Sequence, residues 1–112
     1  MSESLGKVTI ATDVLVSIAR LTALATPGVA SLCSTGVRAV FGGRDAGGVR
    51  VAIEDDQVTV DVRIVVEHGA NMLQLSLDLQ RRIARAVQDM VGMDVAAVNV
   101  YISDVEFSLS ED

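Results

Sequence analysis

The chain has 112 residues, half of them hydrophobic, and a formal net charge of −6 at pH 7. This length predicts one domain with a single core, and the negative charge argues against a nucleic-acid binder and against electrostatic adhesion to anionic lipid. No apolar run is long enough to cross a bilayer, the N-terminus lacks a basic signal-peptide start, and the single cysteine, Cys33, cannot form an internal disulfide. We therefore expect a cytoplasmic protein without direct membrane insertion.

The first third of the chain predicts a strand, a helix and a second strand. Residues 7–11 form a short candidate strand, and Thr12 or Asp13 can cap a helix that runs over about residues 12–25. The Pro-Gly pair that follows should end this helix, because proline cannot continue the hydrogen-bond ladder. A second short strand is expected at residues 29–33. One apolar stripe of the helix comprises Val14, Ile18, Leu21 and Ala25.

The next segment, residues 34–48, is rich in glycine and has the weakest pattern. Its Gly42–Gly48 part suggests a phosphate-binding loop, but it lacks the Gly-Lys-Ser/Thr ending of a P-loop and does not run from a strand into a helix. A flexible connector is the expected structure. Within it, Val37–Phe41 can form one helical turn or stay irregular.

Two strands of alternating polarity follow. Residues 49–54 alternate, and from Val58 to Val66 every second residue is apolar. A period of two places one set of side chains on a buried face and the other set in water, which is typical of an antiparallel sheet covered on one face. The tight link Asp55–Gln57 between the two strands predicts a hairpin.

The longest predicted helix covers residues 72–91, where apolar residues recur at spacings of three and four. Asn71 is placed to cap its start and Gly92 to end it. On a helical projection the apolar side chains fill about 200°, whereas packing on a sheet needs only about 100°. The surplus flank must contact either the first helix or another molecule. It comprises Leu73, Leu77, Ala84 and Val91.

A last strand is predicted at residues 98–102, and the apolar parity shifts beyond Asp104, which indicates a bulge or strand end near Ser103. The order of elements is therefore β-α-β-β-β-α-β. This order predicts an α+β fold, with a small mixed β-sheet and two helices on one face. We expect a single domain over residues 1–112, with its core at residues 6–107 and short frayed termini.

The sequence contains no convincing catalytic, cofactor or metal site. Glu67 and His68 are adjacent on a strand, where neighbouring side chains point to opposite faces. Cys33 and His68 could form a thiolate pair, but no local motif supports it, and a small buried cysteine is commoner. One histidine and one cysteine are also too few ligands for a metal site. We expect no enzymatic activity and no cofactor.

Arg81, Arg82 and Arg85 form a basic ridge on the polar arc of the long helix. The ridge is either a solvated face, supported by Asp78 at helical spacing, or a docking surface for an acidic segment of a partner. Together with the surplus flank it gives the candidate interface. This interface comprises Leu73, Leu77, Arg81, Arg82, Ala84, Arg85 and Val91.

Several motifs occur together and in order along nearly the whole chain. Gly69-x-Asn71 precedes the long helix, and Gly92 follows it, before Val98-Asn99-Val100. In this arrangement the chain resembles the alkaline-shock-protein family of envelope stress response proteins, found mainly in Gram-positive bacteria. It departs from the family pattern at His68, where an aromatic residue is usual, at Met72-Leu73, where Ile-Pro is frequent, and at Val91, where threonine is common.

The resemblance implies a small non-enzymatic cytoplasmic protein that self-associates, or that small membrane proteins recruit beneath the cell membrane. It brings no established catalytic residues. The expected function is therefore that of a homo-oligomeric scaffold near the membrane, acting through protein–protein contacts. The alternative is a small-ligand-binding regulatory module acting as a homo-oligomer. Such a module should have a polar-lined pocket near the Gly42–Gly48 loop, whereas a scaffold needs none.

Overall fold

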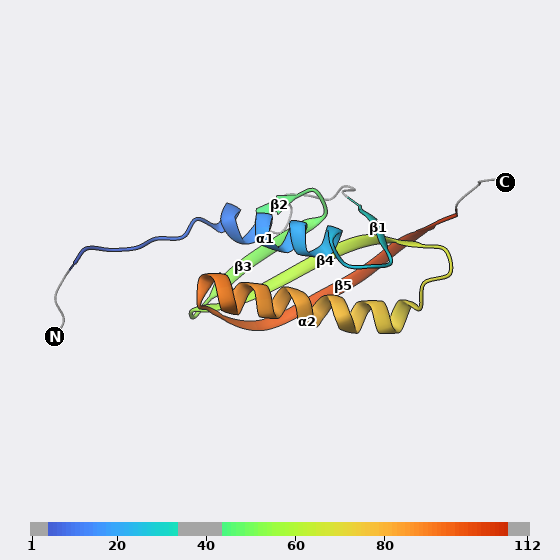
Figure 1. The fold of residues 1–112 in the computed structure, drawn as a ribbon. Helices are drawn as coiled ribbons and strands as arrows, with labels where there is room; N and C mark the ends of the chain where they lie inside the picture. The colour runs from blue at the N-terminus through green and yellow to red at the C-terminus, as the bar shows by residue number, and fades with distance from the viewer. Residues whose placement is uncertain (1–4, 34–43, 108–112) are drawn as a thin grey trace.

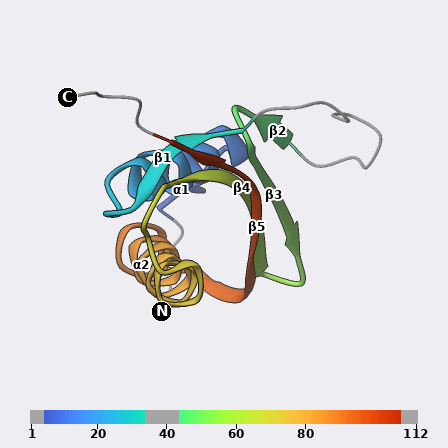
Figure 2. The ribbon, with the colours of Figure 1, turned by 90° about the vertical axis from the view of Figure 1, so that its right-hand side faces the viewer.

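The computed structural model of the chain describes residues 5–33 and 44–107. In chain order the elements are α1 (Thr12–Leu24), β1 (Val29–Leu32), β2 (Arg44–Ala46), β3 (Val49–Glu54), β4 (Gln57–Glu67), α2 (Met72–Val91) and β5 (Asp94–Glu106) (Figure 1). The strands form one five-stranded sheet, and Figure 2 shows both helices on the same side of it. The expected α+β class and layered arrangement are confirmed. The helical turn considered for Val37–Phe41 lies outside the described residues.

β4 is the central strand, and all but one of the other strands pair with it. β5 runs parallel to it along its whole length, from Gln57 beside Asp94 to Glu67 beside Glu106. On the antiparallel side, β3 pairs with residues 57–62 and β1 with residues 64–66. Since a strand has only two edges, β1 and β3 lie end to end along the same edge of β4. β2 extends the sheet beyond β3.

The junction between β1 and β3 requires a glycine. The Arg63 carbonyl accepts a hydrogen bond from the Cys33 N–H (2.9 Å), and the Arg63 N–H donates to the Gly48 carbonyl (2.8 Å). A Cβ at Gly48 would lie 2.8 Å from the Cys33 carbonyl oxygen, and Gly48 also has a φ of +88°. No other residue fits here without moving the backbone.

The core lies between the helices and one face of the sheet and is aliphatic. Every second residue from Val58 to Val66 is fully buried, and so are Val49 and Val51 of β3. The predicted alternation of β4 is therefore confirmed. The helices contribute Leu15, Val16, Ala19, Ala23, Leu75, Leu79, Ile83 and Val87 to the same core.

The bulge predicted in the last strand is also present. β4 residue Ile64 is beside Ile102, but the next residue, Val65, is beside Asp104, so Ser103 is the extra residue. The bulge restores the apolar parity, because both Ile102 and Val105 pack against the core.

The N-terminal part differs from the expectation in two ways. Residues 7–11 form no strand in the described structure, and an additional strand, β2, precedes β3, so the order is α-β-β-β-β-α-β. β2 is joined to β3 by the short turn at Gly47 and Gly48 and forms a local hairpin with it. In addition, Ala11 rather than Thr12 or Asp13 is the N-cap of α1, without a side-chain cap bond.

α1 buries a face different from its Val14–Ile18–Leu21–Ala25 stripe. Val14 and Leu21 are 46% and 65% exposed, while the buried side is the one that carries Ala19 and Ala23. Alanine has a small side chain and lets a helix approach a sheet closely. The side with Ala19 and Ala23 therefore packs on the sheet, and the side with Val14 and Leu21 stays exposed.

The turn between β3 and β4 offers a stability test. Asp55 and Asp56 have φ of +51° and +63°, a conformation that two-residue hairpins favour with glycine at the second position. Asp56→Gly should therefore raise the free energy of unfolding by about 0.5–1 kcal/mol, measured by urea denaturation. Asp89→Gly in α2 is the control and should lower it by a few tenths of a kcal/mol. A loss of stability in Asp56→Gly would contradict the turn geometry.

Candidate interaction surface

α2 has well-defined ends. The Asn71 Oδ1 accepts a hydrogen bond from the Gln74 N–H (2.9 Å). Gly92 ends the helix in the left-handed conformation, and its N–H donates to the Gln88 carbonyl (3.0 Å). Both predicted caps are confirmed. They fix where the 20-residue helix begins and ends.

The two flanks of α2 face different neighbours. On one flank, Leu75 lies against Gly28, which follows α1 in the chain: a Cβ at Gly28 would be 3.4 Å from the Leu75 methyl groups. On the other flank, the Gln80 side chain donates to the Val98 carbonyl of β5 (3.0 Å). One flank of α2 therefore faces α1, and the opposite flank lies beside β5 (Figure 1).

The surplus apolar flank lies on the β5 side. On a helical projection Leu73, Leu77, Ala84 and Val91 all fall within about 60° of Gln80. Leu73 is 67% exposed and Leu77 is 43% exposed, whereas Ala84 and Val91 are partly buried against the core. α1 is on the other side of the helix, so it does not cover Leu73 and Leu77. We call these two residues and Ala84 the α2 flank.

Part of the arginine ridge borders this flank: on the helical projection Arg81 is about 40° and Arg85 about 80° from Leu77, whereas Arg82 is about 140° away. Arg81, Arg82 and Arg85 are all exposed, and the Arg82 Nε donates to the Asp78 carboxylate (2.9 Å). This ion pair is one of those that the helical spacing predicted. An apolar patch rimmed by arginine has the composition of a protein–protein interface. The arrangement can bind a partner surface, but it contains no nucleophile or general base.

The structure does not bring Cys33 and His68 together. Cys33 is half-buried and its N–H donates to the Arg63 carbonyl. His68 is five positions beyond Arg63, about 16 Å away along an extended strand. The His68 ring is exposed and lies 4.8 Å from the Phe107 ring. Among the described residues, no group of three or more His, Cys, Asp or Glu side chains could hold a metal ion.

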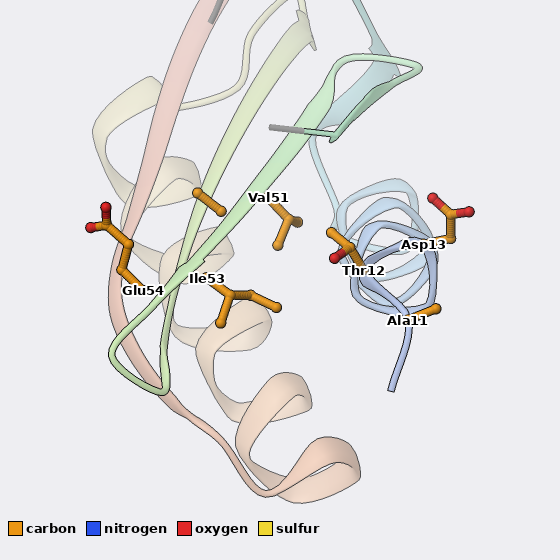
Figure 3. Close-up of a pocket in the computed structure, with 7 residues that line it drawn as sticks. Ala11, Thr12, Asp13, Val51, Ile53 and Glu54 are labelled. Atoms are coloured by element: carbon orange, nitrogen blue, oxygen red, sulfur yellow. The ribbon is translucent and has the colours of Figure 1, made fainter. Parts of the chain in front are cut away.

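Two hollows bear on the ligand-binding alternative. One, of about 580 Å³, lies between the start of α1 and β3. Figure 3 shows that Asp13 points away from β3 and that Glu54 lies on the far side of that strand. The other, of about 510 Å³, is next to Gly47 and has Ser17 and Arg20 in its lining. Asp13, Ser17 and Arg20 are exposed, so neither hollow has the enclosed form of a typical small-molecule site.

The fold and surface define a small α+β protein that exposes an apolar flank on α2 beside Arg81 and Arg85. The model of the alkaline shock protein 23 family, described as having a cell envelope-related function, matches residues 1–107. The chain therefore belongs to this family. The membership agrees with the resemblance found in the sequence.

Two relatives are similar over most of their length. The uncharacterized protein YqhY of Bacillus subtilis (strain 168) is 34% identical over 107 residues, which cover 92% of this chain and 79% of YqhY. The uncharacterized protein Spy1535 of Streptococcus pyogenes serotype M6 is 27% identical over 106 residues, which cover 93% of this chain and 82% of Spy1535. No solved structure matches the chain. Neither helix in the described residues has the length and apolarity that a membrane span requires.

Proposed function

We propose that this member of the alkaline shock protein family is a non-enzymatic scaffold of the cell envelope that self-associates in the cytoplasm and is held at the inner face of the cell membrane by a small membrane-anchored partner. The observation that carries the proposal is the α2 flank. Leu73 and Leu77 expose 67% and 43% of their surface on a helix whose inner face is already packed. Apolar surface left in water favours association, because binding removes it from solvent.

The proposed recruitment to the membrane acts through protein rather than lipid. A net charge of −6 repels an anionic lipid surface. The basic ridge is a local exception, and its exposed Arg81 and Arg85 can pair with an acidic segment of a membrane-anchored partner. Electrostatic complementarity of this kind contributes chiefly to specificity and to the rate of association.

Two measurements test this function: light scattering over a range of protein concentrations reports self-association, and sedimentation with and without a membrane fraction reports recruitment to the membrane. We expect a mass above the 11.8 kDa of one chain that increases with concentration, together with sedimentation of part of the protein with the membranes. A protein that stays at the mass of one chain and remains in the supernatant would contradict the proposal. A turnover that Cys33→Ser or His68→Ala abolishes would contradict its non-enzymatic part.

A further inference from the structure

The N-terminal arm, residues 5–11, has the pattern of a strand but belongs to no sheet in the described structure. Val8 and Ile10 alternate with Lys7 and Thr9. Leu5 is 97% exposed and Val8 is 89% exposed, and Figure 1 shows the arm running away from the body of the domain. An extended segment with one apolar face gains stability only when a sheet edge and an apolar surface receive it.

Such an edge is present on β5. Among the described strands β5 pairs only with β4, so no strand covers its second edge, although the Gln80 side chain already bonds the Val98 carbonyl and the Asp104 side chain the Val105 N–H. The Gln80 side chain reaches this strand at the Val98 carbonyl. Long open edges are normally covered or paired, because their backbone donors and acceptors attract other strands.

The open edge and the α2 flank form one surface. Gln80 places the flank on the β5 side of α2, so Leu73 and Leu77 lie above the position that an additional strand would take. A strand added there would meet backbone hydrogen-bonding groups at its edge and apolar side chains on its helix-facing side. The surface therefore fits an extended segment whose apolar residues all lie on one face.

We propose that residues 6–11 of a second copy of the chain add to the open edge of β5 as a strand. Val8 and Ile10 face the α2 flank, while Lys7 and Thr9 lie on the uncovered face of the sheet. This proposal rests on the self-association proposed above and specifies its contact. In this contact the exposed apolar side chains of the arm and of the α2 flank cover each other.

Charge favours the arm over a second β5 as the added strand. β5 contains Asp94, Asp104 and Glu106 and no basic residue. Antiparallel pairing of two β5 strands would place acidic ends beside acidic ends, which is destabilising. The arm has no acidic residue between positions 5 and 11 and carries Lys7. Its length, about 23 Å when extended, is sufficient to cover the uncharged part of β5 at residues 97–102.

A proline in the arm tests the backbone pairing. Alternate N–H groups of an added edge strand point toward β5, so either Val8→Pro or Thr9→Pro removes an N–H that the ladder needs, and at least one of the two should weaken self-association at least tenfold in sedimentation velocity. Thr9→Val is the control and should associate like the wild type. The melting temperature of the dilute protein should be unchanged in all three variants, since residues 8 and 9 are in no helix or strand. Wild-type association in both proline variants would overturn the arm contact.

Cysteine cross-linking between copies identifies the surface that the arm contacts. In a Cys33→Ser background, Thr9→Cys protein is mixed with Asn99→Cys or Tyr101→Cys protein, two positions on the uncovered face of β5. At least one mixture should give a disulfide-linked dimer, whereas Thr9→Cys mixed with Ala52→Cys on β3 should not. The proposal would be overturned if Thr9→Cys cross-linked to the β5 variants no more than to Ala52→Cys. It would also be overturned if Asn99→Cys cross-linked to Tyr101→Cys more than Thr9→Cys cross-linked to either. If one of these results is obtained while the wild-type protein still self-associates, the arm contact is wrong but the proposed scaffold function is not contradicted.

Discussion

Val62→Asp should unfold the domain, whereas Arg63→Asp should leave it folded. Val62 has no exposed surface, and burying an unpaired carboxylate costs several kcal/mol, which is comparable with the whole stability of a small domain. Arg63 is on the opposite face of β4, with its guanidinium carbon 5.7 Å from the centre of the Tyr101 ring. Losing that contact should cost about 1 kcal/mol.

Thermal unfolding followed by circular dichroism measures the difference between the two variants. Val62→Asp should show no cooperative transition, while Arg63→Asp should melt within several degrees of the wild type. Equal melting temperatures would mean that the two faces of β4 are wrongly assigned.

The second large effect separates the two faces of α2. Leu79 has no exposed surface, while Leu77, only two residues before it, is 43% exposed. Leu79→Glu should therefore unfold the chain for the same reason as Val62→Asp. Leu77→Glu should leave a folded monomer and abolish self-association, because it places a charge in the centre of the α2 flank.

Circular dichroism melts and sedimentation velocity, measured on both variants, distinguish these outcomes. An unfolded Leu77→Glu would show that Leu77 supports the fold of its own chain. A folded Leu77→Glu that associates like the wild type would remove the α2 flank from the interface.

The parts of the fold that could be predicted from sequence depend on local signals. The alternation in β4 follows from the period of two, and the ends of α2 follow from Asn71 and Gly92, whose side-chain and backbone chemistry suit those positions. The bulge at Ser103 could be predicted because the apolar residues of a strand change from one parity to the other only when an extra residue is inserted.

The N-terminal part could not be predicted because a local pattern does not show which sheet edge or surface, if any, receives a segment. Residues 7–11 have a strand pattern, yet β2 lies on the outer edge of β3. α1 is apolar on two sides, and the pattern alone does not show that the side with Ala19 and Ala23 packs on the sheet. Periodicity identifies an apolar face, whereas only the packed structure shows what covers it.

The same limit applies to the candidate surface. The width of the apolar arc predicted a surplus flank on α2, but the neighbour of that flank depended on the crossing of α2 over the sheet. The Gln80–Val98 hydrogen bond joins residues 18 positions apart and places the flank beside β5. No signal in the sequence indicates that contact, because a glutamine on a helix ordinarily points into solvent.

Sedimentation velocity of the wild type and of Leu77→Glu at increasing concentration is the most direct test of the scaffold account. The wild type should sediment faster as concentration rises, while Leu77→Glu should remain at the 11.8 kDa expected for one chain. A wild-type protein that sediments as a single chain at every concentration would contradict the account.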